Sequence, residues 1–123
     1  MSEGVLVSGY WDASFPYPGA MQLGQRFEAE TQGTPGAQIA NSPAVAQVLL
    51  DAIAQAGSLD AEKINAAIAA TDKSYVVGPV KFAADHTSPI PLTMAQWQSG
   101  GARVVWPSDR ANGQLIVGLP SAP

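Results

Sequence analysis

The sequence has no cysteine and only one histidine. Without thiols the chain has no disulfide, no thiolate metal ligand and no cysteine nucleophile. His86 lies in the polar, proline-bounded stretch DHTSP, so we interpret it as a solvated loop residue rather than a catalytic base or a metal ligand. The carboxylates are scattered and no base stands in a recognisable motif. We therefore predict that the chain is not an enzyme and has no metal site.

Charge is also scarce, at 13% of the 123 residues with a net charge of −4. Six basic residues are too few for an electropositive face, so no nucleic-acid partner is expected. The motifs GxGxxG and GxxxxGK[ST] are absent, and no cofactor is predicted. No apolar run is long enough for a membrane span, and the start MSEGVLVSG lacks the features of a signal peptide.

Against these absences, hydrophobic residues make up 46% of the sequence, which predicts a packed core. The strongest helical signal covers Ser42 to Gly57. Ser42 is a candidate cap, Pro43 is tolerated in a first turn, and Gly57 is a typical end. Spacings of three and four residues predict an apolar stripe on one side of this helix, formed by Val45, Val48, Leu49, Ala52, Ile53 and Ala56. A sheet or another helix is needed to cover it.

Two further helices are predicted, one on each side of the first in sequence. One runs from Ala20 to Gln32, and Gly24 within it permits close packing. The other is capped by Asp60 and runs through Ala70. Its connection to the long helix is short, so the two should form a hairpin-like pair.

Strand signals lie near both ends of the chain. The apolar run between Glu3 and Gly9 suits a buried strand in a parallel sheet. Ser74 to Phe82 is β-rich but is broken by Gly78-Pro79, which favours a bent crossing segment or two short pieces at a sheet edge. Gln114 to Val117 is a candidate last strand.

A hairpin is predicted from Leu92 to Trp106. Its arms are Leu92 to Gln98 and Arg103 to Trp106, joined by Ser99-Gly100-Gly101-Ala102. Trp97 and Trp106 are candidates to pair across it, with core packing as the simpler role for both.

The stretch Tyr10 to Gly19 is a loop, because its aromatics and prolines follow neither a helical nor a strand period. Aromatics at the carboxyl end of a strand in an open α/β protein are candidates for ligand contact. For Tyr10 and Trp11, ligand contact and simple anchoring of the loop are both open; anchoring is favoured for Phe15 and Tyr17. Gln38 and Asn41 precede the long helix, where they would cap it, line a cleft or face solvent.

Taken in order, several stretches resemble the C-terminal third of an ABC-transporter solute-binding protein of the branched-chain amino acid and amide group. They are GVLVSGYWDASFPYPG, AVAQVLLDAIAQAGSLDAEKINAAIAATD, YVVGPVKF and MAQWQSGGARVVWP. The resemblance implies an α/β fold, part of the two-lobed type 1 periplasmic-binding fold. Residues 1–107 would be the C-terminal portion of the ligand-binding domain, spanning both lobes, and residues 108–123 a tail. Strands that cover the apolar stripe would then lie upstream of this sequence.

The resemblance further implies a ligand-binding component of an ABC importer for amino acids, amides or small aromatic acids. An amide- or amino-acid-sensing domain of a receptor or regulator is the alternative. Tyr10 and Trp11 match the loop position that faces the cleft, and Gln38 falls near a position that often carries an aromatic contact. The polar Gln38 at this position argues against a purely aliphatic ligand. An ABC permease as partner, a periplasmic location and self-association of the fragment are the remaining expectations.

Overall fold

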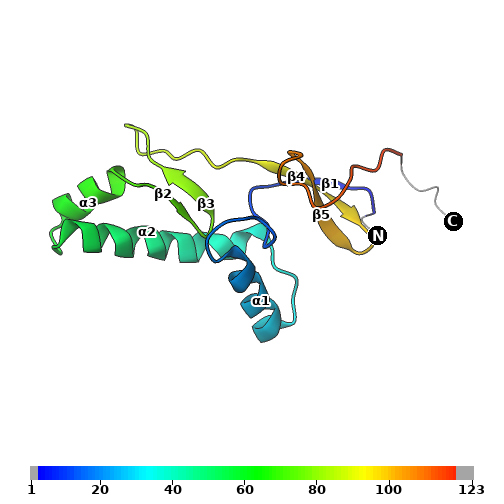
Figure 1. Cartoon of the computed structure of the whole chain (residues 1–123), viewed down its shortest axis with the longest axis horizontal. Coiled ribbons are helices and arrows are strands. Elements are labelled where there is room, and N and C mark those ends of the chain that lie inside the picture. Colours follow the sequence, from blue (N-terminus) through cyan, green and yellow to red (C-terminus); the bar gives the residue numbers. More distant parts are fainter. Residues whose placement is uncertain (1–2, 119–123) are drawn as a thin grey trace. The chain divides into compact units, whose positions relative to one another are not determined.

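The computed structural model describes residues 3–118 (Figure 1). The elements in chain order are β1 (Leu6–Gly9), α1 (Ala20–Thr31), the 3₁₀ helix η1 (Ala37–Ala40), α2 (Asn41–Ala56), α3 (Ala61–Ala69), β2 (Asp72–Tyr75), β3 (Gly78–Lys81), β4 (Thr93–Gln98) and β5 (Gly101–Trp106). They form two compact units, which we call the sheet unit (residues 3–10 and 91–118) and the helical unit (residues 11–90). The predicted mixed α/β class is confirmed. No helix among the described residues has both the length and the apolar character needed to cross a membrane.

The sheet unit is a three-stranded antiparallel sheet in the order β1-β4-β5. The predicted hairpin is confirmed as β4 and β5, which are joined at Ser99 and Gly100. Both residues have positive φ, 52° and 82°, which is the backbone twist that a two-residue hairpin loop requires. This tight turn fixes the register in which Gln98 lies opposite Gly101.

The direction and burial predicted for the first strand are wrong. β1 pairs antiparallel with β4, and Leu6 lies opposite Gln96. Val5 and Leu6 are each 48% exposed rather than buried. A continuous apolar run indicates apolar residues on both faces of a strand, but it carries no information about the direction of the partner strand. That partner comes from the far end of the sequence.

The two tryptophans of the hairpin do not pair with each other. Trp97 lies opposite Ala102, and Trp106 lies opposite Met94. A register shift between Met94 and Ala95 inserts an extra residue on β5, and a bulge of this kind changes the face to which the following side chains point. Trp106 is 57% exposed, so its predicted core role is also wrong.

The interior of the sheet unit contains a buried glutamine, Gln96. Its Nε2 donates to the carbonyl oxygens of Gly4 at 3.1 Å and Ile116 at 3.0 Å. Its Oε1 accepts from the Ile116 N–H at 2.9 Å and from Gln98 Nε2 at 2.8 Å. Gln98 Nε2 also donates to the Gln114 carbonyl oxygen at 2.6 Å. Side chains therefore hold the segment that we predicted as a last strand, and it forms no strand ladder.

In the helical unit, α1 and α3 confirm the two helices predicted before and after the long helix. The long helix, α2, begins differently from its prediction. α2 follows directly on η1, so the chain is already helical before Ser42. The residue preceding α2 is Ala40, with no side-chain cap, and the predicted Ser42 cap is wrong. At the other end Gly57 takes the left-handed conformation, and its N–H donates to the Ile53 carbonyl oxygen at 3.1 Å. Gly57 thus ends the helix as predicted.

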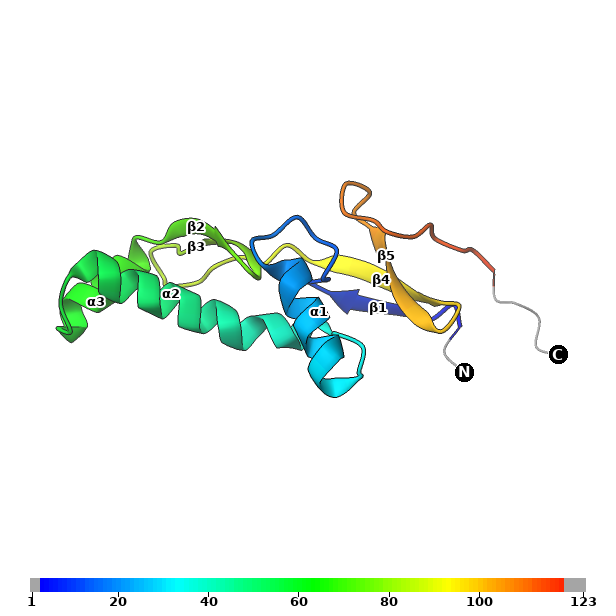
Figure 2. The ribbon, with the colours of Figure 1, turned by 60° about the horizontal axis from the view of Figure 1, so that its bottom comes forward.

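α3 begins with the predicted cap, since Asp60 Oδ1 accepts from the Lys63 N–H at 3.0 Å. α2 and α3 pack against each other as the expected pair (Figure 2). Residues Ser74 to Phe82 resolve into the two short pieces that were one of the two predictions. They are the antiparallel strands β2 and β3, which turn at Val76 and Val77. The interruption predicted at Gly78-Pro79 is wrong, because both residues lie within β3, opposite Tyr75 and Ser74.

Candidate functional site

The loop that begins at Trp11 packs on the turn between β2 and β3. Trp11 is buried, 5% exposed, and its indole Nε1 donates to the Val76 carbonyl oxygen at 2.8 Å. Phe15 is also buried and meets the Tyr17 ring edge-on, with ring centroids 5.4 Å apart. The Tyr17 ring lies so close to Gly78 that a Cβ there would be 2.8 Å from it. Phe15 and Tyr17 therefore anchor the loop, as predicted.

The same loop holds its shape through local hydrogen bonds and a close helix contact. Asp12 Oδ1 accepts from the Ser14 N–H at 2.9 Å and from Ser14 Oγ at 2.6 Å. A Cβ at Gly24 on α1 would come within 2.5 Å of the Ala13 Cβ. Gly24 thus allows α1 to approach the loop closely, as its position in the sequence suggested.

The residues predicted to contact ligand differ in their surroundings. Tyr10 is half-buried at the end of one segment of the sheet unit. Trp11 is in the core of the helical unit, where its indole satisfies a backbone carbonyl group. Gln38 is exposed on η1, in the helical unit. Exposure leaves Gln38 accessible to a solute, while burial gives Trp11 a packing role. Ligand contact by all three residues stays a prediction.

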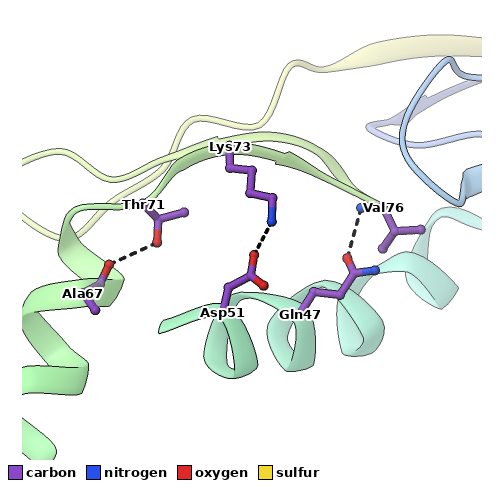
Figure 3. Close-up of polar contacts among 6 residues, drawn as sticks. All are labelled: Gln47, Asp51, Ala67, Thr71, Lys73 and Val76. Carbon is purple, nitrogen blue, oxygen red and sulfur yellow. Dashed lines mark hydrogen bonds and ion pairs between the residues drawn. The ribbon is translucent and has the colours of Figure 1, made fainter. Parts of the chain in front are cut away.

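A row of polar contacts joins α2 to β2, and sequence reasoning missed it (Figure 3). Lys73 Nζ lies 2.5 Å from Asp51 Oδ2, and 5.3 Å from the centroid of the Tyr75 ring. The Val76 N–H donates to Gln47 Oε1 at 3.2 Å. Gln47 and Asp51 are four residues apart, so they share one side of the helix. That spacing was the available signal, but the partners lie 22 and 29 residues away in the sequence.

These contacts shift the protonation equilibria of the residues involved. The hydrogen bond from Lys73 lowers the pKa of Asp51, and the same bond raises the pKa of Lys73. Burial, followed by the interaction with Asp51, raises the pKa of Tyr75. At neutral pH the cluster is a solvent-exposed ion pair beside a neutral phenol. It offers no group poised for acid–base chemistry, and its role is to tie β2 to α2.

An apolar groove of about 650 Å³ lies within the helical unit. It is lined by Asn41, Ala44, Val45, Val48, Leu49, Ile68, Val77, Pro79, Val80, Phe82, Ser88 and Ile90. No charged residue belongs to this lining. His86 is exposed in the loop after β3, as predicted. Within residues 3–118, no cluster of three or more acidic, histidine or cysteine side chains is arranged to hold a metal ion.

Solved structures similar to this chain are ABC-transporter solute-binding proteins. A leucine-binding protein of Thermotoga maritima matches 84% of this chain with a TM-score of 0.73 and 24% sequence identity. A solute-binding protein of R. palustris, solved in complex with benzoate, matches 85% with a TM-score of 0.71 and 19% identity. The chain has part of the type 1 periplasmic-binding fold.

A periplasmic binding protein of Burkholderia mallei matches with a TM-score of 0.70 and 17% identity. The chain spans about 30% of the length of these proteins, at 30%, 29% and 30% respectively. They are solute-binding proteins rather than enzymes. No protein-family model and no curated protein sequence matches the chain.

Proposed function

We propose that this chain is the C-terminal portion of the solute-binding component of an ABC importer. The observation that carries the proposal is the match of 84% of the chain to a leucine-binding protein with a TM-score of 0.73. The groups on the described residues fit this role, because they provide an anchored loop, a polar residue on an exposed turn and no catalytic constellation. Binding of this kind needs no covalent step, only closure of two lobes on a solute.

The proposed ligand is an amino acid, an amide or a small aromatic acid. Two similar structures support this range, since one is named for leucine and the other holds benzoate. In this chain Gln38 carries an amide on an exposed 3₁₀ turn, and an amide both donates and accepts hydrogen bonds. Tyr10 would contribute aromatic surface, whereas Trp11, 5% exposed, would act by holding the loop in place. An ABC permease as partner and an extracytoplasmic location belong to the same proposal.

The test is a fluorescence titration of the complete protein, made by joining this chain to its upstream reading frame. We expect saturable binding of leucine, a short amide or benzoate, and a loss of affinity of about tenfold for Gln38→Ala, typical of one lost polar contact. Ser42→Ala is the matched control, an exposed position beyond η1 on the same segment. An upstream frame that encodes no further α/β segment, or a complete protein that binds none of these solutes, would contradict the proposal. A fused signalling segment upstream would indicate the sensing alternative instead.

A further inference from the structure

The turn between β2 and β3 contains residues that do not favour a turn. Val76 and Val77 are β-branched, which suits them to strands, and both are buried. Gly78 follows them with a φ of 106°, a conformation that glycine adopts readily. The local sequence therefore supplies only part of the turn, and contacts from other elements supply the rest.

Side chains from α2 and from the loop that begins at Trp11 hold this turn. Gln47 Oε1, on α2, accepts from the Val76 N–H at 3.2 Å (Figure 3). The Trp11 indole Nε1 donates to the Val76 carbonyl oxygen at 2.8 Å. Further along the loop, the Tyr17 ring lies against Gly78. Both backbone groups of Val76 are therefore engaged, the N–H by α2 and the carbonyl oxygen by the loop.

This arrangement links the position of Trp11 to that of Gln47. Only two backbone dihedral angles separate the N–H of a residue from its own carbonyl group, so fixing the Val76 N–H limits where the carbonyl oxygen lies. That oxygen in turn fixes the indole of Trp11. Trp11 is bonded directly to Tyr10, the aromatic residue that the proposed function places at the solute.

We propose that Gln47 is a positioning residue for the solute-binding loop, residues 10–17, and acts through Val76 and Trp11. The inference rests on the proposed function and deepens it, because it names what holds the loop in place. A loop that is ordered before the solute arrives loses less conformational entropy on binding, so the Gln47 contact raises affinity.

Gln47→Met tests the proposal in the complete protein, because methionine matches glutamine in length and helix propensity but has only a weak acceptor. The variant and the natural protein are titrated with leucine, acetamide and benzoate. For the solute that the natural protein binds, we expect Kd to rise about three- to tenfold, the range given by one lost hydrogen bond. Gln47→Glu keeps an oxygen acceptor and should restore Kd to within about twofold. Equal losses in the two variants would overturn the proposal, since the acceptor would then not matter.

Two matched variants serve as controls. Lys73→Met breaks the ion pair with Asp51, which also ties β2 to α2 but does not involve Val76. Gln55→Met replaces another exposed glutamine of α2. Both should keep Kd within about twofold of the natural value. A loss in Lys73→Met as large as that in Gln47→Met would overturn the proposal, because the general attachment of β2 would then set the affinity.

The route through Trp11 has a readout of its own. The indole proton of Trp11 gives an NMR signal that is identified by its disappearance in Trp11→Phe. We expect Gln47→Met to speed the exchange of this proton with solvent at least about threefold, while Lys73→Met leaves the rate unchanged. An indole proton that is equally protected in the natural protein and in Gln47→Met would overturn the proposal, even where affinity falls.

The same titrations separate the two levels of inference. A natural protein that binds none of the three solutes would refute the proposed function and, with it, the role of Gln47 in binding. A natural protein that binds solute no more tightly than Gln47→Met would refute the positioning role and leave the proposed function intact.

Discussion

The two units of the chain are stabilised in different ways. Among the described residues of the sheet unit three are buried, and two of them, Thr93 and Gln96, are polar; the third is Val104. Gln96 is satisfied through hydrogen bonds to residues 92 and 20 positions away. The helical unit instead buries aromatic and aliphatic side chains such as Trp11, Phe15 and Val76. The difference teaches that one unit depends on hydrogen-bond geometry and the other on packing, so distinct substitutions should break them.

The largest effect is expected in the helical unit from Trp11→Ala. It removes a buried indole and leaves the Val76 carbonyl oxygen without its donor, at a cost of about 3–5 kcal/mol in the free energy of unfolding. Urea denaturation followed by circular dichroism measures it. Trp106→Ala is the control, since that residue is 57% exposed and the change should cost under about 1 kcal/mol. Equal stability of the two variants would show that Trp11 does not hold the loop.

The next effect is expected in the sheet unit from Gln96→Leu. The leucine is similar in size but leaves the Gly4 and Ile116 backbone groups without partners, at a cost of about 2 kcal/mol. Amide exchange at Ile116 should accelerate together with the loss of stability. Gln98→Leu, whose side chain donates to a single backbone oxygen at Gln114, should cost about half as much. A Gln96→Leu variant as stable as the natural chain would show that the glutamine network is dispensable.

The smallest effect concerns pH and the tie between α2 and β2. The pKa of Asp51 is lowered in the folded chain, so its contribution to stability is present above the unfolded value of 3.8 and is lost as pH falls through the folded pKa. The pKa of Lys73 is raised, so its contribution is present below 10.5 and is lost as pH rises through the folded value.

Comparing the urea midpoints of the natural chain and Lys73→Met at pH 7 and pH 3 isolates the acid part of this effect. We expect the natural chain to lose slightly more stability on acidification, because the pair is solvent-exposed and screened. Identical pH profiles would show that the ion pair adds nothing.

Sequence patterns predicted the elements whose signals are local. Gly57 ended α2 and Asp60 capped α3, because a left-handed residue and a side-chain cap are decided by a few neighbouring residues. The break in the β-rich run lies at Val76-Val77 rather than at the predicted Gly78-Pro79, and the prediction missed it because neither valine carries a turn signal of its own. The Ser42 cap failed because the preceding 3₁₀ turn, which has no strong sequence signal, brought the chain into a helical conformation one turn early.

Features that depend on distant partners were beyond those patterns. The direction of β1 is set by β4, and the facing of Trp106 is set by a bulge elsewhere in the hairpin. The candidate site shows the same division. The loop anchors Phe15 and Tyr17 were predictable from aromatic and proline content, while the burial of Trp11 depends on a carbonyl group 65 residues away.

The distribution of the three tryptophans gives the chain a built-in optical readout. Trp11 lies in the helical unit, shielded from solvent, whereas Trp97 and Trp106 both lie in the sheet unit, half-buried and exposed. A shielded indole emits at shorter wavelength and resists quenching by iodide. A solvent-exposed indole emits at longer wavelength and is readily quenched. One emission spectrum with added quencher therefore reports on each half of the molecule separately, without an attached dye.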